Sequence, residues 1–178
     1  MNTNKTTARV WQQIHLNFYT QYSYNKWHNV QKVCPLCQKI PESIYHLILY
    51  CDLTVQLWEE LQPTLMKLHP VLVSDEAKAF GIEQKKQTNG ILLRNWLTYL
   101  LRDNIAEAEK AAYYAPTRVT LEKFKQHFNE DLKFEIQIKA FQYKNENKLD
   151  IFDKIITHAE VLCQKRDNGE YRIPPVFS

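Results

Sequence analysis

Apolar side chains recur at intervals of three and four along most of the chain, which is the spacing of amphipathic helices. Three glycines interrupt the pattern in 178 residues. The first helix is predicted from about Thr6 to Thr20, and an aromatic connector from Tyr19 to Val33 follows it. A short helix is then expected to begin near Pro41, a residue suited to the first turn of a helix. The chain therefore starts as a series of short helical elements.

A longer helix is predicted from Asp52 to about Leu68, because leucines and Trp58 recur there at helical spacing. The Asp52 side chain is expected to cap its first turn. Pro63 is expected to kink or trim the last turn, because proline lacks the amide hydrogen that a helix interior requires.

The segment from Pro70 to Gly90 is polar and mixed, and it reads as a connector. Within it, Ser74 and the two acidic residues after it can start a short helical turn. A long helix is predicted from Ile91, and Pro116 is expected to end it.

The helical pattern resumes at Leu121. Between Leu132 and Lys139 apolar and polar residues alternate, which fits a strand as well as a helix, and helix is favoured because no turn residues bound the stretch. A last helix is predicted from about Leu149 to Lys165, with Gly169 a few residues beyond its end.

These elements predict a mainly α fold. Near its N-terminal end we expect a metal-binding knuckle, formed by the segment from Cys34 to Cys51 that is described below. With 44% apolar and aromatic residues, a chain of this length can bury a core. We divide it into residues 1–69, which hold a basic and aromatic lead-in, the knuckle and the following helix, residues 70–90 as a connector, and residues 91–178 as a helical C-terminal region.

The net charge of +3 permits a polyanionic partner without requiring one. The distribution of charge says more, because the first acidic residue of the chain is Glu42 and five basic residues precede it. We see neither a signal peptide nor a membrane span. We therefore expect an intracellular protein of the nucleus or cytoplasm, with reduced thiols, no membrane partner and no small-molecule substrate.

The segment CPLCQKIPESIYHLILYC carries the most specific chemistry in the sequence. Its ligand spacing is C-x2-C-x8-H-x4-C, formed by Cys34, Cys37, His46 and Cys51. Two thiolates two residues apart can hold one metal from a single turn, and a short helix can bring the histidine to it. Four soft or borderline ligands with no vacant position predict one structural Zn²⁺ ion.

Two alternatives to this ligand set stay open from the sequence. The four residues can be buried cysteines and a surface histidine that fall together by chance. His28, six residues before Cys34, can replace Cys51 as a ligand. The fourth cysteine, Cys163, lies among apolar residues and is interpreted as a small buried hydrophobic side chain rather than a ligand.

The lead-in to the knuckle interleaves cations with aromatic rings. Cations neutralise phosphates and exposed rings stack on unpaired bases, so the composition suits RNA or single-stranded DNA. Aromatic residues in such positions also serve as core packing. The candidate nucleic-acid-binding residues are Arg9, Tyr22, Tyr24, Lys26, Trp27, Lys32 and Lys39.

No catalytic set accompanies these residues, and we do not expect an enzyme. The sequence lacks the paired aspartates of a polymerase metal site, a glycine-rich phosphate loop and a nucleophile with an evident base. Three acid-x-Lys fragments, at Glu83, Asp131 and Glu146, leave a metal-dependent nuclease as a minor alternative.

From Trp11 to Leu61 the chain resembles the zinc-binding region near the C-terminus of reverse transcriptases from non-LTR, LINE-like retrotransposons. The lead-in WQQIHLNFYTQYSYNKW, the Cys-x-x-Cys turn, the pair His46-Leu47, the closing Cys51 and the later Trp58 carry the resemblance. It implies the same four zinc ligands. It also implies an accessory domain that helps hold RNA template or target DNA during target-primed reverse transcription, with the polymerase body of the parent element as a partner.

A second reading of the same residues is a protein-interaction module. In it, zinc fixes a helical surface that docks on the polymerase. Charge reversal of Lys26 and Lys32 would then leave binding unchanged, whereas changes to the apolar surface would abolish it.

Overall fold

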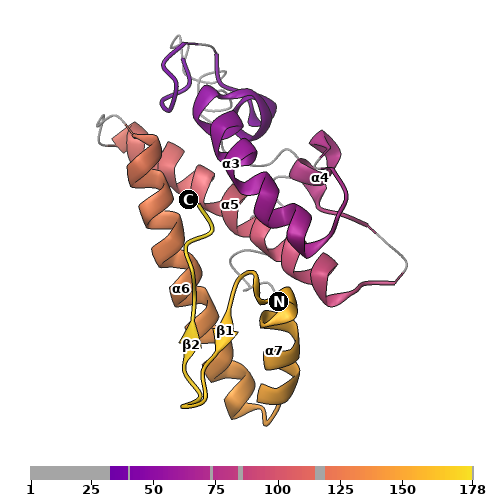
Figure 1. Ribbon diagram of the computed structural model, residues 1–178. Coiled ribbons are helices and arrows are strands. Elements are labelled where there is room, and N and C mark those ends of the chain that lie inside the picture. Colours follow the sequence, from indigo (N-terminus) through magenta and orange to yellow (C-terminus); the bar gives the residue numbers. More distant parts are fainter. Residues whose placement is uncertain (1–32, 40, 73, 84–85, 115–118, 178) are drawn as a thin grey trace.

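The computed structural model describes residues 33–39, 41–72, 74–83, 86–114 and 119–177, and the helix predicted at Thr6 to Thr20 lies outside them. The described part is mainly helical, as predicted (Figure 1). Its elements, in chain order, are η1 (His46–Tyr50), α3 (Asp52–Leu68), α4 (Asp75–Phe80), α5 (Asn89–Tyr114), α6 (Leu121–Asn145), α7 (Leu149–Ile156), η2 (His158–Glu160), β1 (Gln164–Lys165) and β2 (Tyr171–Arg172).

Helix α3 follows the predicted range but differs in its details. Its N-cap is Cys51, while Asp52 is the first helical residue and directs its carboxylate to Lys39 instead of capping the helix. Pro63 stands inside α3, and the helix continues beyond it to Leu68, so the proline does not end it. The buried face of α3, which includes Leu57, Leu61 and Leu65, packs against α5.

The connector between α3 and α5 is attached to α5 by side-chain hydrogen bonds. The predicted turn at Ser74 is confirmed as the start of α4, where the Ser74 hydroxyl accepts the amide hydrogen of Ala77 at 3.2 Å. After α4, the Asn95 side chain accepts from the Ile82 amide at 2.7 Å and donates to the Ile82 carbonyl at 2.9 Å. One amide side chain thus satisfies both backbone groups of a residue outside regular structure.

Helix α5 contacts α3, α6 and α7, and α6 also contacts α3 and α7. The stretch between Leu132 and Lys139 is helical, which confirms the preference for helix over strand there. Phe124, Phe128 and Ile136 share the buried face of α6. Apolar side chains at multiples of four residues on that face point into the core. The other apolar residues of the alternating stretch lie on a second face of the helix.

The predicted last helix is wrong beyond its second turn. Helix α7 ends at Ile156, and the chain then forms η2 and an antiparallel pair in which Gln164 faces Arg172. The physical reason is a set of tertiary contacts between residues that are distant in the sequence. The Asp153 carboxylate binds the Lys165 ammonium and accepts a hydrogen bond from the Tyr171 hydroxyl at 2.5 Å. These bonds hold the strands against α7 and require the chain to reverse.

The end of the described chain returns to the helices. The Asn129 side chain accepts from the Val176 amide at 3.1 Å, and the Thr64 hydroxyl donates to the Val176 carbonyl at 3.3 Å. The Phe177 and Phe128 rings meet edge to face with centroids 5.1 Å apart. The tail therefore joins α3 to α6. One hydrophobic cluster extends from Cys34 to Phe177, and the division at residues 70–90 stays a prediction.

Candidate metal centre

The first two ligands of the candidate site lie in a tight turn. The Gln38 amide donates to the Cys34 carbonyl at 2.7 Å, and Val33 pairs with Pro41 in an antiparallel bridge. Gln38 has a φ of 57°, a left-handed conformation that costs most side chains energy. The turn reverses the chain so that Cys34 and Cys37 face the helix that follows.

The other two ligands frame a π-helical turn. His46 begins η1 and Cys51 follows its last residue, and the Cys51 amide donates to the His46 carbonyl at 2.7 Å. The Ser43 hydroxyl accepts the His46 amide hydrogen at 3.0 Å. Because a π turn holds one more residue than an α turn, it brings positions five apart to the same side of the backbone. His46 and Cys51 consequently approach the turn together.

Helix α3 holds this π turn through two buried side chains. The Thr54 hydroxyl donates to the Leu47 carbonyl at 2.8 Å, and the Trp58 indole nitrogen donates to the Ile48 carbonyl at 2.7 Å. A buried carbonyl without a partner is costly, so these bonds favour the wide turn over its alternatives. They fix the backbone between His46 and Cys51 and so position both side chains.

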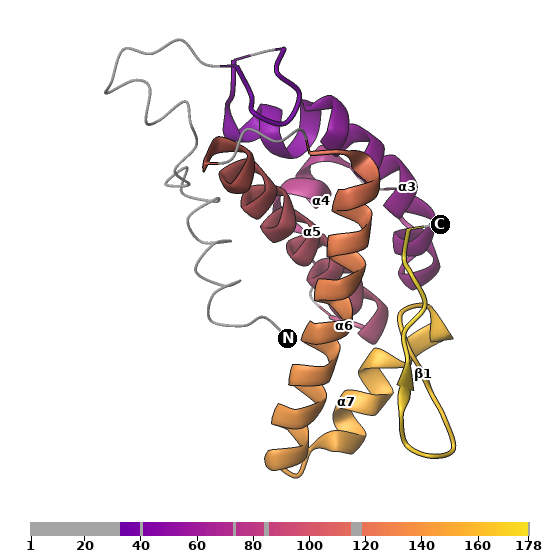
Figure 2. The same ribbon diagram turned by 90° about the vertical axis from the view of Figure 1, so that its left-hand side faces the viewer.

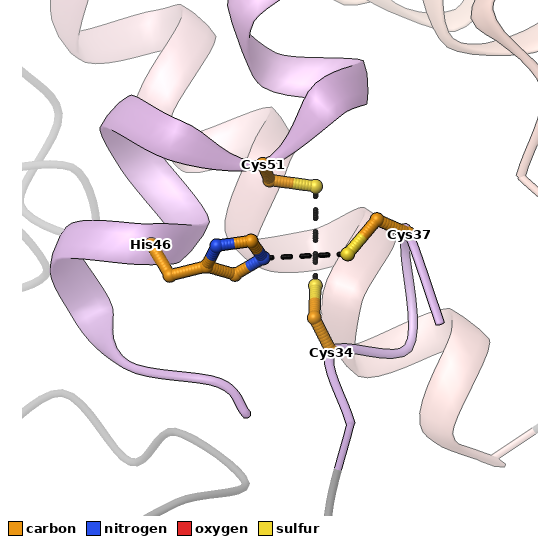
Figure 3. Close-up of side chains that lie close together, drawn as sticks. All are labelled: Cys34, Cys37, His46 and Cys51. Atoms are coloured by element: carbon orange, nitrogen blue, oxygen red, sulfur yellow. Dashed lines mark hydrogen bonds between the residues drawn. The ribbon is translucent and has the colours of Figure 1, made fainter. Parts of the chain in front are cut away.

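The four side chains converge on one point (Figure 3). Each offers one ligand atom, and these atoms all lie within 4.8 Å of one another. The Cys34 and Cys51 sulfurs are 3.9 Å apart, and the Cys37 sulfur lies 3.4 Å from the His46 Nε2 atom. Cys34, His46 and Cys51 are buried and Cys37 is partly exposed. The cluster can hold a metal ion.

The electrostatics of the cluster favour thiolate at one sulfur. The pKa of Cys51 is lowered to about 5, chiefly by the hydrogen bond from Cys34 and also by the backbone amides of Leu53 and Thr54, in spite of burial, which raises it. The same hydrogen bond, together with burial, raises the pKa of Cys34. Cys51 stands at the start of α3, where the helix dipole also favours negative charge. A thiolate is the form of cysteine that binds metal.

The structure tests little of the predicted nucleic-acid surface. Arg9, Tyr22, Tyr24, Lys26, Trp27 and Lys32 lie outside the described residues, as does the alternative ligand His28. Lys39 is described. Its side chain is 68% exposed, and its ammonium lies 2.6 Å from the Asp52 carboxylate. Lys39 is thus at the surface beside the cluster, but in an ion pair.

Sequence reasoning found the four clustered residues and missed the side chains that position them. Trp58 is expected as an apolar residue at helical spacing, whereas in the structure its indole nitrogen also donates to the backbone of η1. Ser43 and Thr54 carry no signal in the sequence, because their partners are single backbone atoms. Cys163 is buried, as expected, although it lies after η2 and not within the predicted last helix.

Comparison with protein-family models, curated proteins and solved structures found no match for this chain. Across the described ranges, no helix has both the length and the apolar character needed to cross a membrane. In those same ranges Cys34, Cys37, His46 and Cys51 are the one group of three or more potential metal-binding side chains. A function for this part of the chain therefore has to account for this cluster first.

Proposed function

We propose that the cluster binds one structural Zn²⁺ ion and that the chain is a nucleic-acid-binding accessory domain. In this proposal it belongs to the reverse transcriptase of a non-LTR retrotransposon and helps hold RNA template or target DNA during target-primed reverse transcription. The observation that carries the proposal is the convergence of three cysteines and one histidine directly after a basic, aromatic segment.

The donor set and its spacing support zinc. Zn–S bonds of about 2.3 Å at a tetrahedral angle separate two sulfurs by roughly 3.8 Å. The Cys34 and Cys51 sulfurs lie 3.9 Å apart. Three thiolates and an imidazole form one of the usual structural zinc sites, and four protein ligands leave no position for a substrate. The ion would fix the turn against η1 and α3.

The candidate nucleic-acid-binding residues support the second half of the proposal by their chemistry. Six of the seven precede Val33, so a folded knuckle anchors the chain directly after them. Lysine and arginine neutralise phosphates, and tyrosine and tryptophan offer faces on which unpaired bases stack. The affinity for RNA or single-stranded DNA should then fall as salt increases.

The zinc proposal is tested by metal content and by substitution of one ligand. We expect one zinc per chain by elemental analysis, and loss of that zinc in Cys51→Ala, because three ligands leave the tetrahedron incomplete. Cys163→Ala is the matched control, since it removes an equally buried thiol outside the cluster. A full complement of zinc in the Cys51→Ala variant would contradict the ligand assignment.

The nucleic-acid proposal is tested on the zinc-loaded chain with labelled single-stranded RNA and DNA across a salt series. Replacing Lys26 and Lys32 by glutamate should weaken binding by roughly tenfold or more and flatten the salt dependence, because two phosphate contacts are lost. Lys154→Glu, an exposed change on α7, should leave binding unchanged. Salt-independent binding, or none, would contradict the proposal.

A protein-docking module is the second candidate, and the surface of the knuckle favours it in one respect. Lys39 is engaged by Asp52, while Tyr45 and Tyr50 on the same segment are more than half exposed. Exposed aromatic side chains are typical anchors of protein interfaces. If this candidate is right, Tyr45→Ser and Tyr50→Ser will abolish binding to a reverse transcriptase body, and charge reversal at Lys26 and Lys32 will not.

A further inference from the structure

Cys37 differs from the other three clustered residues in its access to solvent. Cys34, His46 and Cys51 are buried, whereas Cys37 is partly exposed. Figure 2 shows the turn that carries Cys37, in indigo, at one end of the molecule. The reactivity of a protein thiol toward small oxidants follows its exposure and its ionisation, and a cysteine that binds metal is ionised. Among the three sulfurs of the cluster, Cys37 is therefore the first that a dissolved oxidant reaches.

Two further sulfurs lie close enough to Cys37 to form a disulfide with it. The ligand atoms of the four residues all lie within 4.8 Å of one another. An S–S bond is about 2.05 Å long, so rotation of the side chains and a small shift of the backbone have to bring two sulfurs together. The Cys34 and Cys51 sulfurs are also close, at 3.9 Å, but both are buried away from an oxidant. An exposed sulfur and a neighbouring thiol that can react with its oxidised form thus occur in one cluster.

The turn selects Cys34 as the partner of Cys37. Both belong to the same tight turn, which the hydrogen bond from the Gln38 amide to the Cys34 carbonyl closes at 2.7 Å. Residues three apart in a tight turn have Cα atoms within about 7 Å, which is the range that a disulfide spans. Cys51 lies on a separate element, as the N-cap of α3. Loss of one metal ligand weakens the attachment between these elements but leaves Cys34 and Cys37 in the same turn.

We propose that Cys37 is a site of reversible oxidation and that a disulfide between Cys34 and Cys37 releases the metal. The Cys37 thiolate attacks one oxygen of hydrogen peroxide, the O–O bond breaks, and hydroxide leaves behind a sulfenic acid. The Cys34 thiolate then attacks the Cys37 sulfur, an S–S bond forms, and the S–O bond breaks with loss of a second hydroxide. The two sulfurs together lose two electrons, and the peroxide is reduced.

The disulfide removes both ligands that the turn supplies. A disulfide sulfur carries no negative charge, and the thiolate is the form of cysteine that binds zinc. The ion would keep only His46 and Cys51, whereas a structural site needs four ligands. Oxidation therefore frees the turn from η1 and α3, and reduction of the disulfide by a thiol restores the site. This consequence rests on the proposed Zn²⁺ ion, but the disulfide itself does not.

Hydrogen peroxide added to the zinc-loaded full chain tests the proposal. A chromogenic chelator should record release of the zinc, and a thiol reductant with fresh zinc should reverse the loss. Trypsin cleaves after Lys32 and Lys39, so Cys34 and Cys37 share one peptide and Cys51 lies in the next. After oxidation, the first peptide should weigh two hydrogen atoms less and resist alkylation, while the peptide with Cys51 remains alkylated.

Histidine substitutions separate the exposed sulfur from the buried ones without removing a ligand. Cys37→His and Cys51→His each leave two cysteines and two histidines, which also form a structural zinc site. Elemental analysis first establishes the zinc content of both variants. In peroxide, Cys37→His should release zinc at least roughly tenfold more slowly than the wild type, whereas Cys51→His should release it at the wild-type rate. The peptide map of the wild-type chain decides the matter even where a variant binds no zinc.

Two results would overturn the proposal: zinc release from Cys37→His as fast as from the wild type, or a disulfide that joins the two peptides. The test also separates this inference from the proposed function. A chain without zinc that still forms the disulfide between Cys34 and Cys37 would support the oxidation site and contradict the Zn²⁺ ion. A zinc-loaded chain in which Cys37 stays reduced would do the reverse.

Discussion

Glu109 shows how far burial sets the chemistry of a single residue in this fold. Its side chain is buried on α5, and burial raises its pKa from the ordinary 4.5 to about 8. That value includes two smaller effects, since the nearby Glu42 carboxylate raises the pKa and Lys110 lowers it. The carboxyl group is therefore mainly protonated in the folded protein at neutral pH and ionised in the unfolded chain.

The raised pKa of Glu109 predicts the direction of a pH effect on stability. Between pH 4.5 and about 8 the folded state binds the proton that the unfolded state loses, so this residue reduces stability as pH rises. Glu109→Gln should raise the free energy of unfolding near pH 8 by about 1–3 kcal/mol more than it does near pH 5. Urea unfolding at both pH values measures this, with exposed Glu59→Gln as control. Equal gains at both pH values would mean that the ionisation of Glu109 is not the cause.

At the scale of elements, the sequence predicted those helices whose position depends on the spacing of apolar residues within the helix itself. The range of α3, the start of α5 and the helical character of α6 follow from apolar periodicity, and the four clustered residues follow from the chemistry of cysteine and histidine at short separations. The end of α7 did not follow, because Asp153 binds Lys165 and Tyr171, which are 12 and 18 residues away. A five-residue π turn also has no distinct periodicity, so η1 could not be separated from an ordinary helix.

The π turn η1 supports a prediction about the element that positions two ligands. Thr54→Val keeps the volume of the side chain but removes the hydroxyl that binds the Leu47 carbonyl. The buried carbonyl then lacks that partner, and we expect a loss of about 1–3 kcal/mol in the free energy of unfolding. Metal affinity should fall as well, because His46 and Cys51 lie on either end of the turn. Competition with a chromogenic chelator measures the affinity.

Thr54→Ser provides the comparison for that experiment, since it retains the hydroxyl and loses one methyl group. It should keep metal affinity close to wild type while losing a smaller part of the stability. If the valine and serine variants bind metal equally well, the hydrogen bond from α3 does not position the ligands.

At the scale of the whole molecule, the candidate metal site is one end of a continuous core. Cys34 and Cys51 belong to the same hydrophobic cluster as Leu57 and Leu61 on α3, which extends to Phe152 on α7. The tail at Val176 adds a second connection between α3 and α6. Most of the buried apolar side chains lie on α3, α5 and α6, away from the ligands. If the cluster holds the proposed Zn²⁺ ion, the turn and η1 depend on it more than the rest of the core does.

Removal of the metal should consequently loosen one end of the molecule without unfolding the rest. Binding of a structural zinc contributes on the order of 10 kcal/mol to the segment that it holds, and the turn with Cys34 and Cys37 contains no helix of its own, so the metal ties it to η1 and α3. Hydrogen exchange with a chelator should increase in that segment and the first turn of α3, while α5 and α6 stay protected. The His46→Ala variant should show the same exchange with or without chelator. Loss of protection throughout α5 and α6 would mean that the metal holds the entire fold, whereas no change in the wild-type chain would mean that the four residues bind no metal.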